Sequence, residues 1–255
     1  MDLIKLKWTV PKSSDGADLA VISDIHLGNR FHDHKSYRKN LEWLYEHKEY
    51  KILTTGDLIE CSSKHTMGLP DQIISVEDQI ESIIRDLEPL AKEKRIIGMI
   101  QGNHEERAIN NSGVNITRDI ARYLEVANLG ISSIFYIRVK EAGSRRGQHY
   151  TMYAKHGSSF ARRVGGKVNA MMNMSKTAHV DLYLHAHLHD LLHEVSDIYE
   201  VDRGSLRLKR KHYVMTGGYL LHGGYVEKKG YAPSGPSGSA RIKFHTYEHR
   251  IAVKI

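Results

Sequence analysis

Short apolar runs alternate with longer amphipathic stretches from residue 18 onward. The runs from Asp18 to Ser23 and from Lys51 to Thr55 are predicted to be buried strands, and the stretch from Tyr37 to Lys48 between them a helix. Apolar residues at helical spacing predict a second helix from Asp71 to Lys94, followed by a strand from Arg95 to Ile100. These repeated strand-helix-strand units predict a largely parallel sheet.

The pattern changes after a helix predicted over Ile116 to Glu125, where short strands follow one another with brief connections. The predicted strands are Ser133 to Lys140, His149 to Lys155, Val180 to Leu184, Leu192 to Val201, Leu206 to Met215 and Arg241 to Lys254. They predict a second, mainly antiparallel sheet. The length of 255 residues favours one domain over residues 1–255.

Composition excludes several classes of protein. Hydrophobic residues make up 40% and charged residues 26%, as in an ordinary globular chain. No apolar stretch approaches the ~18 residues of a membrane span, and lysines interrupt the first segment, so we expect a cytoplasmic protein without membrane attachment. The single cysteine, Cys61, cannot form an internal disulfide. A formal charge of +7 favours polyanionic partners such as nucleic acid.

Polar side chains follow the first three predicted strands, at the ends where ligands bind in open α/β sheets. Asp24 and His26 follow the first strand, with one residue between them, and Asp57 follows the second. Asn103 and His104 follow the third. Carboxylate, amide and imidazole groups all bind divalent metals.

Two later strands also end in histidine. His156 follows one of them, and His185, His187 and His189 alternate with other residues after the next. A single histidine at such a position is more often a core or surface residue than a ligand. Chance does not readily place ligand-type side chains at five successive strand ends. The pattern therefore predicts a metal site.

These residues resemble the signature of the calcineurin-like metallophosphoesterases: DxH, GDxxD, GNH followed by D or E, an isolated His, and GHxH. The match runs in order from Asp24 to His189. The resemblance implies an α/β fold in which a two-sheet β-sandwich is flanked by helices, in α/β/β/α layers. It also implies a site for two metals.

The resemblance further implies a role for each motif residue. One metal would be held by Asp24, His26, Asp57 and the second histidine of the last motif, and the other by Asp57, Asn103, His156 and the first. His104 would be the catalytic histidine that binds no metal. Glu60 stands where the family has the Asp that orients this histidine, and it is one methylene longer.

The last motif lacks its glycine, so two registers are possible. Leu184 or Ala186 could occupy the glycine position. Because a small residue belongs where the backbone turns sharply, Ala186 is the better substitute. His187 and His189 are then the ligands, and His185 is left without a direct role.

The expected chemistry is hydrolysis of a phosphate ester. Two metals about 3.5–4 Å apart bind the phosphate oxygens and lower the pKa of a bridging water, so that a hydroxide attacks phosphorus. His104 then protonates the leaving alkoxide as general acid. The mixed Asp, Asn and His ligands favour manganese first, with iron, zinc or nickel as alternatives.

Basic residues near these motifs are candidate substrate contacts. His65 lies in the loop after Asp57, and Arg162, Arg163 and Lys167 follow His156 in a predicted helix. The last three could instead form a solvated helical face. The basic strand from Arg207 to Lys211 could be a nucleic-acid track or a charged edge strand that resists aggregation.

The preferred interpretation is a two-metal phosphodiesterase or nuclease acting on nucleic acid or nucleotides. One alternative is a phosphomonoesterase or protein serine/threonine phosphatase of the same fold. Another is a catalytically silent metalloprotein that binds nucleic acid, which the intact ligand set and His104 argue against. The sequence carries no signal for an oligomeric state.

Overall fold

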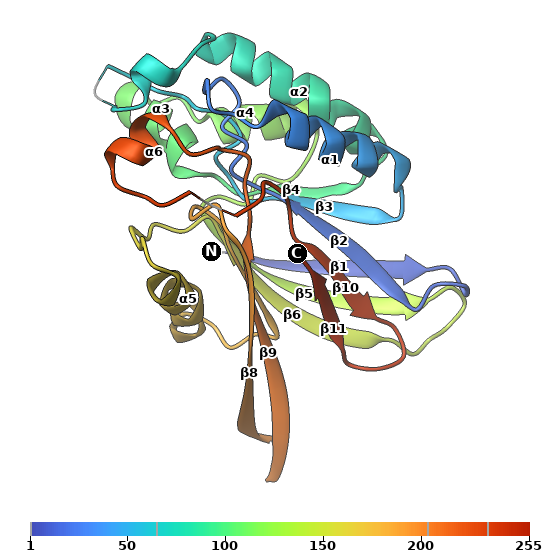
Figure 1. Ribbon diagram of the computed structural model, residues 1–255. Helices are drawn as coiled ribbons and strands as arrows, with labels where there is room; N and C mark the ends of the chain where they lie inside the picture. The colour runs from blue at the N-terminus through green and yellow to red at the C-terminus, as the bar shows by residue number, and fades with distance from the viewer. Residues whose placement is uncertain (1, 65, 203, 234) are drawn as a thin grey trace.

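Two β-sheets pack face to face, with helices on their outer sides, in the computed structural model of the protein (Figure 1). It describes residues 2–64, 66–202, 204–233 and 235–255, so His65, a predicted substrate contact, lies outside the described residues. The α/β fold with two sheets and flanking helices is confirmed. Within the described residues, no helix is both long and apolar enough to cross a membrane.

The first sheet contains the strands that end in the DxH, GD and GNH motifs. In order across the sheet, its strands are β11 (Ile251–Lys254), β10 (Arg241–His245), β2 (Gly16–Ile22), β3 (Tyr50–Thr54) and β4 (Ile96–Met99). The last three run parallel, as predicted. The single strand predicted over Arg241 to Lys254 is wrong, because the polar residues between Thr246 and Arg250 turn the chain into an antiparallel hairpin.

The second sheet is mixed, so the prediction of a mainly antiparallel sheet is wrong. Its order is β1 (Asp2–Val10), β5 (Ser132–Glu141), β6 (Gln148–Lys155), β7 (Leu182–His185), β9 (Ser205–Thr216) and β8 (Leu191–Asp202). β1 pairs parallel with β5, and β7 runs parallel with both of its neighbours. The parallel pairing of β6 with β7 follows from the helical crossover between them. β9 pairs with β7 only from His212 to Met215, so over its basic residues, Arg207 to Lys211, β8 is its one partner strand among the described residues, as the edge-strand interpretation expects.

Two apolar layers hold these sheets in place. Between the sheets, buried side chains such as Leu19, Phe135, Tyr150 and Phe244 form one core. A second core lies between the first sheet and the helices that cover it. These helices are α1 (His34–Glu46), α2 (Val76–Lys92) and α4 (Ile116–Tyr123), and α3 (Asn103–Ser112) lies beside them (Figure 1).

The predicted long helix begins five residues later than expected. The Ser75 side chain caps α2 by accepting the backbone N–H of Asp78, and Ile73, which precedes the cap, is exposed. Four shorter helical elements are also described: α5 (Val164–Met172), α6 (Gly224–Lys228) and the 3-10 turns at Leu69–Asp71 and Asn173–Lys176. α5 packs on the outer face of the second sheet, where Met171 and Met174 contact its tyrosines.

Candidate metal centre

The carboxyl ends of five strands from both sheets carry the predicted ligands. Asp24 follows β2, Asp57 follows β3 and Asn103 begins α3 after β4. His156 follows β6, and His187 follows β7. Because parallel strands end at the same edge of a sheet, these side chains are brought together as the sequence predicts.

The backbone turns sharply at the predicted ligands. Five of the eight described non-glycine residues with φ in the left-handed region are Asp24, His26, Asp57, His187 and His189, with φ between 49° and 74°. Such conformations cost about 1–3 kcal/mol each and persist where the surrounding structure holds them. Backbone strain is therefore concentrated at the residues whose side chains face the centre.

Ligand-type side chains among the described residues form three groups at this edge: one is His26, Glu60 and His104, and the other two contain only predicted ligands. Asp24, His26 and His189 make up one of these two triads, in which the ligand atoms lie within 4.8 Å of one another. The other triad consists of Asp57, His156 and His187, and its ligand atoms also lie within 4.8 Å of one another. Each triad is part of one of the two ligand sets that the resemblance implies.

Asp57 belongs to the second triad and also approaches a histidine of the first. Its Oδ2 atom is 3.2 Å from Nε2 of His156 and 3.8 Å from Nε2 of both His26 and His104. Its Oδ1 atom accepts the backbone N–H of His104 at 2.8 Å. Burial alone raises the pKa of this carboxyl, but His156 and His104 hold the pKa well below its usual range. Asp57 is thus placed to serve both metal positions as a carboxylate.

The residues present fit a pair of divalent cations. Asp24 Oδ1 and His187 Nδ1 are buried and have no hydrogen-bond partner, and such atoms cost about 1–3 kcal/mol each when left unpaired. Burial lowers the pKa of His156, but Asp57 and Asp24 outweigh it and raise this pKa to about 10. The centre therefore attracts positive charge, and its nitrogen and oxygen donors suit manganese, iron or zinc.

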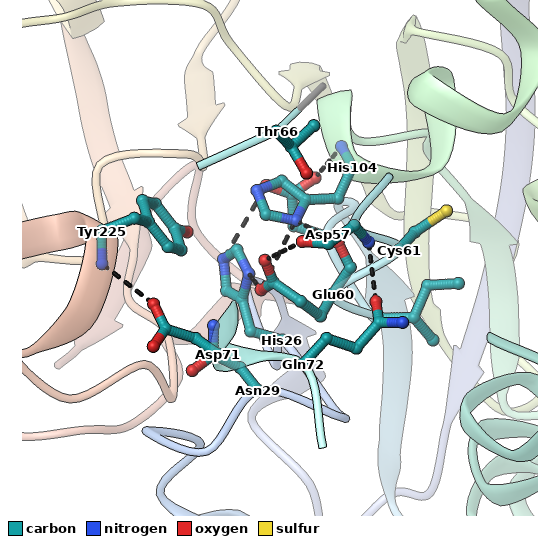
Figure 2. A network of polar contacts seen from close by, with 12 residues as sticks. His26, Asn29, Asp57, Glu60, Cys61, Thr66, Asp71, Gln72, His104 and Tyr225 are labelled. Atoms are coloured by element: carbon teal, nitrogen blue, oxygen red, sulfur yellow. Dashed lines mark hydrogen bonds and ion pairs between the residues drawn. The ribbon is translucent and has the colours of Figure 1, made fainter. Parts of the chain in front are cut away.

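Hydrogen bonds behind the ligands fix which ring nitrogen faces the centre. His156 Nδ1 donates to the carbonyl of Thr55 at 2.8 Å, which leaves Nε2 facing Asp57 and 3.0 Å from Asn103 Oδ1. His26 Nδ1 lies 3.1 Å from Glu60 Oε2 (Figure 2). This is the usual arrangement behind histidines that ligate metals.

The Glu60 carboxylate lies near both His26 and His104, and it is closer to His26 than to the histidine it was expected to orient. This carboxylate lies against His26 and accepts the Ser62 hydroxyl at 2.9 Å, while its distance to His104 Nδ1 is 3.6 Å. The main-chain carbonyl of Glu60 instead accepts from His104 Nδ1 at 2.6 Å (Figure 2). Glu60 therefore orients both imidazoles, one through its side chain and one through its backbone.

Glu105, the acidic residue after GNH, acts as a clamp beneath the site. Its buried carboxylate accepts the backbone N–H groups of Asp57, Leu58 and Gly102 at 3.0, 2.7 and 3.1 Å. One side chain thus joins the loop after β3 to the first turn of α3. The relative positions of Asp57 and His104 depend on it.

His104 is buried beside a residue that the motifs did not indicate. Arg107 lies one turn further along α3, with its Nη2 atom 2.8 Å from His104 Nε2. The helical spacing of three residues was the available signal. Burial lowers the pKa of His104 to about 3, which keeps its imidazole neutral in the free protein.

The last motif follows the register in which Ala186 takes the glycine position. His187 and His189 belong to the two triads. His185 is the final residue of β7; its Nδ1 donates to the carbonyl of Ala186 at 2.6 Å, and its ring packs against Gly157. His185 therefore supports the backbone beneath the site.

The predicted substrate contacts are only partly brought to the site. Lys167, on α5, lines the cavity beside the triads and pairs with Asp190. Arg162 and Arg163 are exposed, precede α5 and do not line this cavity. The guanidinium of Arg162 instead lies 5.7 Å from the centre of the Tyr231 ring.

A second wall faces the triads across a cavity of about 110 Å³, and the sequence did not reveal it. It is formed by Phe160, Tyr225, Lys229 and Tyr231, which we call the loop wall. The backbone N–H of Tyr225 donates to Asp71 Oδ2 at 3.1 Å, which ties α6 to the loop after β3 (Figure 2). Two tyrosines and two lysines occur within residues 225–231, but the glycines around them suggest only a turn.

Comparison with known proteins places the chain in a family. The family model for calcineurin-like phosphoesterases matches residues 17–191, which is most of the chain. The protein therefore belongs to the calcineurin-like phosphoesterases, the class that the strand-end motifs indicate. Its sequence matches no curated protein significantly.

Several solved structures resemble the chain weakly. Vacuolar protein sorting 29 from Cryptosporidium parvum has 14% identity and a TM-score of 0.43, over 94% of this chain and 98% of that one. A metallophosphoesterase from Sphaerobacter thermophilus has 14% identity and a TM-score of 0.41, over 92% and 89%. The E. coli phosphoesterase Yfce has 12% identity and a TM-score of 0.40, over 89% and 87%. The family membership rests on the sequence match.

Proposed function

We propose that the protein is a two-metal phosphodiesterase that acts on nucleic acid or nucleotides. The observation that carries this proposal is the composition of the cavity. Cations and aromatic rings surround the two triads: Arg107, Lys167 and Lys229 on one hand, and Tyr225 and Tyr231 on the other. Cations bind phosphate oxygens, and aromatic rings stack on bases.

The two triads and Asn103 would hold the metals, of which manganese is the first candidate. When bound, two divalent metals supply charge that stabilises the phosphate oxygens and a water activated for attack. Arg107 and Lys229 are placed to bind non-bridging oxygens. Lys167 is less available, because Asp190 already pairs with it.

His104 is the proposed proton donor to the leaving oxygen. Its pKa of about 3 applies to the free protein, where burial is the largest cause. A phosphate anion that enters the cavity adds negative charge beside the ring, which raises the pKa and favours protonation. The carbonyl of Glu60 holds Nδ1, so Nε2 is the atom that would face the substrate once Arg107, whose Nη2 lies 2.8 Å from it, turns to the phosphate.

The aromatic part of the loop wall favours a diester over a monoester. A phosphomonoester or phosphoprotein substrate needs cations but no stacking surface on the far side of the phosphate. The Lys229 ammonium lies 5.4 Å from the centre of the Tyr225 ring, so a charged and an apolar group act at the same place. A nucleoside attached through a phosphate matches that combination.

Turnover of two chromogenic esters tests the proposal. We expect manganese-loaded protein to hydrolyse bis(p-nitrophenyl) phosphate with a kcat/KM at least about tenfold above that for p-nitrophenyl phosphate. Chelation should abolish both activities, and added manganese should restore them. A higher kcat/KM for the monoester would favour the monoesterase, and no turnover of either ester would favour a silent binding protein.

A further inference from the structure

The outward side chains of β1, β5 and β6 form a basic face beside the metal centre. Strand alternation directs Phe135, Ile137 and Val139 into the core, so the residues between them point away from it. The register places Lys5 beside Tyr136, and Lys7 beside Arg138. The positively charged residues of this face are Lys5, Lys7, Arg138, Lys140 and Lys155.

No acidic residue compensates these charges. The outward positions of β1, β5 and β6 carry no Asp or Glu, and none of the five cations forms an ion pair within the described residues. The basic residues of β9 differ in this respect. There, Arg210 pairs with Asp197 and Lys211 pairs with Glu200. Uncompensated charge on a flat sheet attracts polyanions, so this face fits the role better than β9.

The turn after β5 extends the basic face. Arg138 and Lys140 donate to the carbonyls of Arg145 and Ser144, at 2.6 and 3.3 Å. These contacts hold the turn against the strands. Arg145 and Arg146 are exposed there, so they add two further cations at the end of the face remote from the metal centre.

An aromatic platform lies in the middle of the basic face. Tyr136 on β5 and His149 on β6 are both exposed, and their rings stack with centroids 5.3 Å apart and planes 21° from parallel. Bases that are not paired in a duplex stack on such rings, with a contribution of about 1–3 kcal/mol each. A duplex would offer only its phosphates to this surface.

The basic face leads directly to the metal centre. Lys155 is the last residue of β6 and precedes the proposed ligand His156. A groove joins the two regions, and its lining includes Lys155, His156 and Asn103 together with one acidic residue, Glu106. From this groove to the far turn, β6 spans about eight residues at ~3.3 Å each, or roughly 26 Å. That length accommodates a segment of about four nucleotides or more.

We infer that the face formed by β1, β5 and β6 binds single-stranded nucleic acid and directs it to the metal centre. The direction of the strand into the centre rests on the proposed function, whereas binding to the face does not. Phosphates contact the lysines and arginines, and bases stack on Tyr136 and His149.

Fluorescence anisotropy with a labelled oligothymidine of about 12 nucleotides, in the presence of chelator, tests the inference. Lys7→Glu/Arg138→Glu should weaken binding at least about tenfold and reduce the salt slope by about 1.4, since each phosphate on a single strand contributes about 0.7. Tyr136→Ala should weaken binding about fivefold or more, without reducing the salt slope. Lys35→Glu/Lys39→Glu on α1 makes the same charge change on exposed residues of another face, and it should alter binding less than twofold.

Hydrolysis of bis(p-nitrophenyl) phosphate by manganese-loaded protein separates this inference from the proposed function. All variants should hydrolyse the small diester as the natural protein does, which also shows that they fold. Equal losses of binding in the β-face and α1 variants overturn the inference, as does equal affinity for single strand and duplex. Binding that is retained by a protein without diesterase activity supports the face and contradicts the proposed function.

Discussion

The two walls of the cavity differ in how firmly the fold holds them. The wall at the strand ends is buried, so that Asp57 is 1% exposed, and its ligands are tied by hydrogen bonds from both sheets. In the loop wall, Phe160 is 78% exposed and Lys229 is exposed. Under the proposed function, the difference predicts separate roles: the rigid wall would bind metals, and the loop wall would select the substrate.

The largest effect should come from Asp57, which belongs to one triad and approaches a histidine of the other. Asp57→Asn removes the carboxylate charge but keeps the shape, so both metal positions should lose affinity together. We expect kcat/KM for the diester to fall on the order of 10³-fold, because charge stabilisation at the phosphate is lost. Elemental analysis should find well under one metal per chain.

The exposed Asp119→Asn on α4 is the matched control for that change, and it should keep full activity. If Asp57→Asn retains two metals per chain, Asp57 does not bridge them, and the strand-end wall is not organised as described.

A second comparison lies within the strand-end wall itself. His187→Ala removes a member of a triad and should reduce activity about 10²-fold or more, with loss of one metal. His185→Ala removes only the bond to Ala186 and should leave metal content near normal, although the melting temperature should fall. Metal loss in His185→Ala with retention in His187→Ala would instead place Leu184 in the glycine position.

The loop wall should respond more weakly and in a different kinetic constant. Lys229→Gln removes a cation that lines the cavity, so KM for the diester should rise about fivefold while kcat changes less than threefold. The neighbouring exposed Lys228→Gln is the control, because Lys228 does not line the cavity. A tenfold loss of kcat at unchanged KM would assign Lys229 to the chemical step and remove the distinction between the walls.

The smallest effect is a change of stability with pH, and it concerns His32. His32 donates to the carbonyl of Ile25 at 2.7 Å and bridges to Leu220, in the segment that leads to α6. Burial lowers the pKa of His32 from its usual 6.5 to about 4. The unfolded chain therefore binds a proton first, so stability that is present above pH 6.5 is lost as the pH falls toward 4.

His32→Asn should reduce this sensitivity to acid. Between pH 7.5 and 5, the melting temperature of the chelated natural protein should fall further than that of the variant, by on the order of 4 °C. Differential scanning calorimetry of both proteins gives this difference directly. Parallel pH profiles would show that His32 does not couple acid to the stability of this segment.

The strand-end wall could be predicted from the sequence, and the loop wall could not. The motif residues follow their strands at once, so predicting three parallel strands was enough to bring Asp24, Asp57 and Asn103 together. Tyr225 and Lys229 belong to or flank a helix of only five residues, more than a hundred positions after Asn103. No local pattern relates so short a helix to a distant site.

Other differences have equally local causes. β1 carries alternating lysines and was assigned no strand, yet its register with β5 creates much of the basic face. Glu60 was expected to act on His104, and only the folded chain shows that its carboxylate lies closer to His26. Sequence reasoning thus located the chemistry but missed contacts that depend on side-chain placement and strand order.

The central claim is that two metals occupy the strand-end triads, with Asp57 shared between them. Anomalous diffraction from crystals soaked in manganese tests it most directly. We predict two peaks about 3.5–4 Å apart, one beside Asp24, His26 and His189 and the other beside Asp57, His156 and His187. A single peak from a fully loaded crystal would contradict the claim. Peaks that lie outside these triads would contradict it as well.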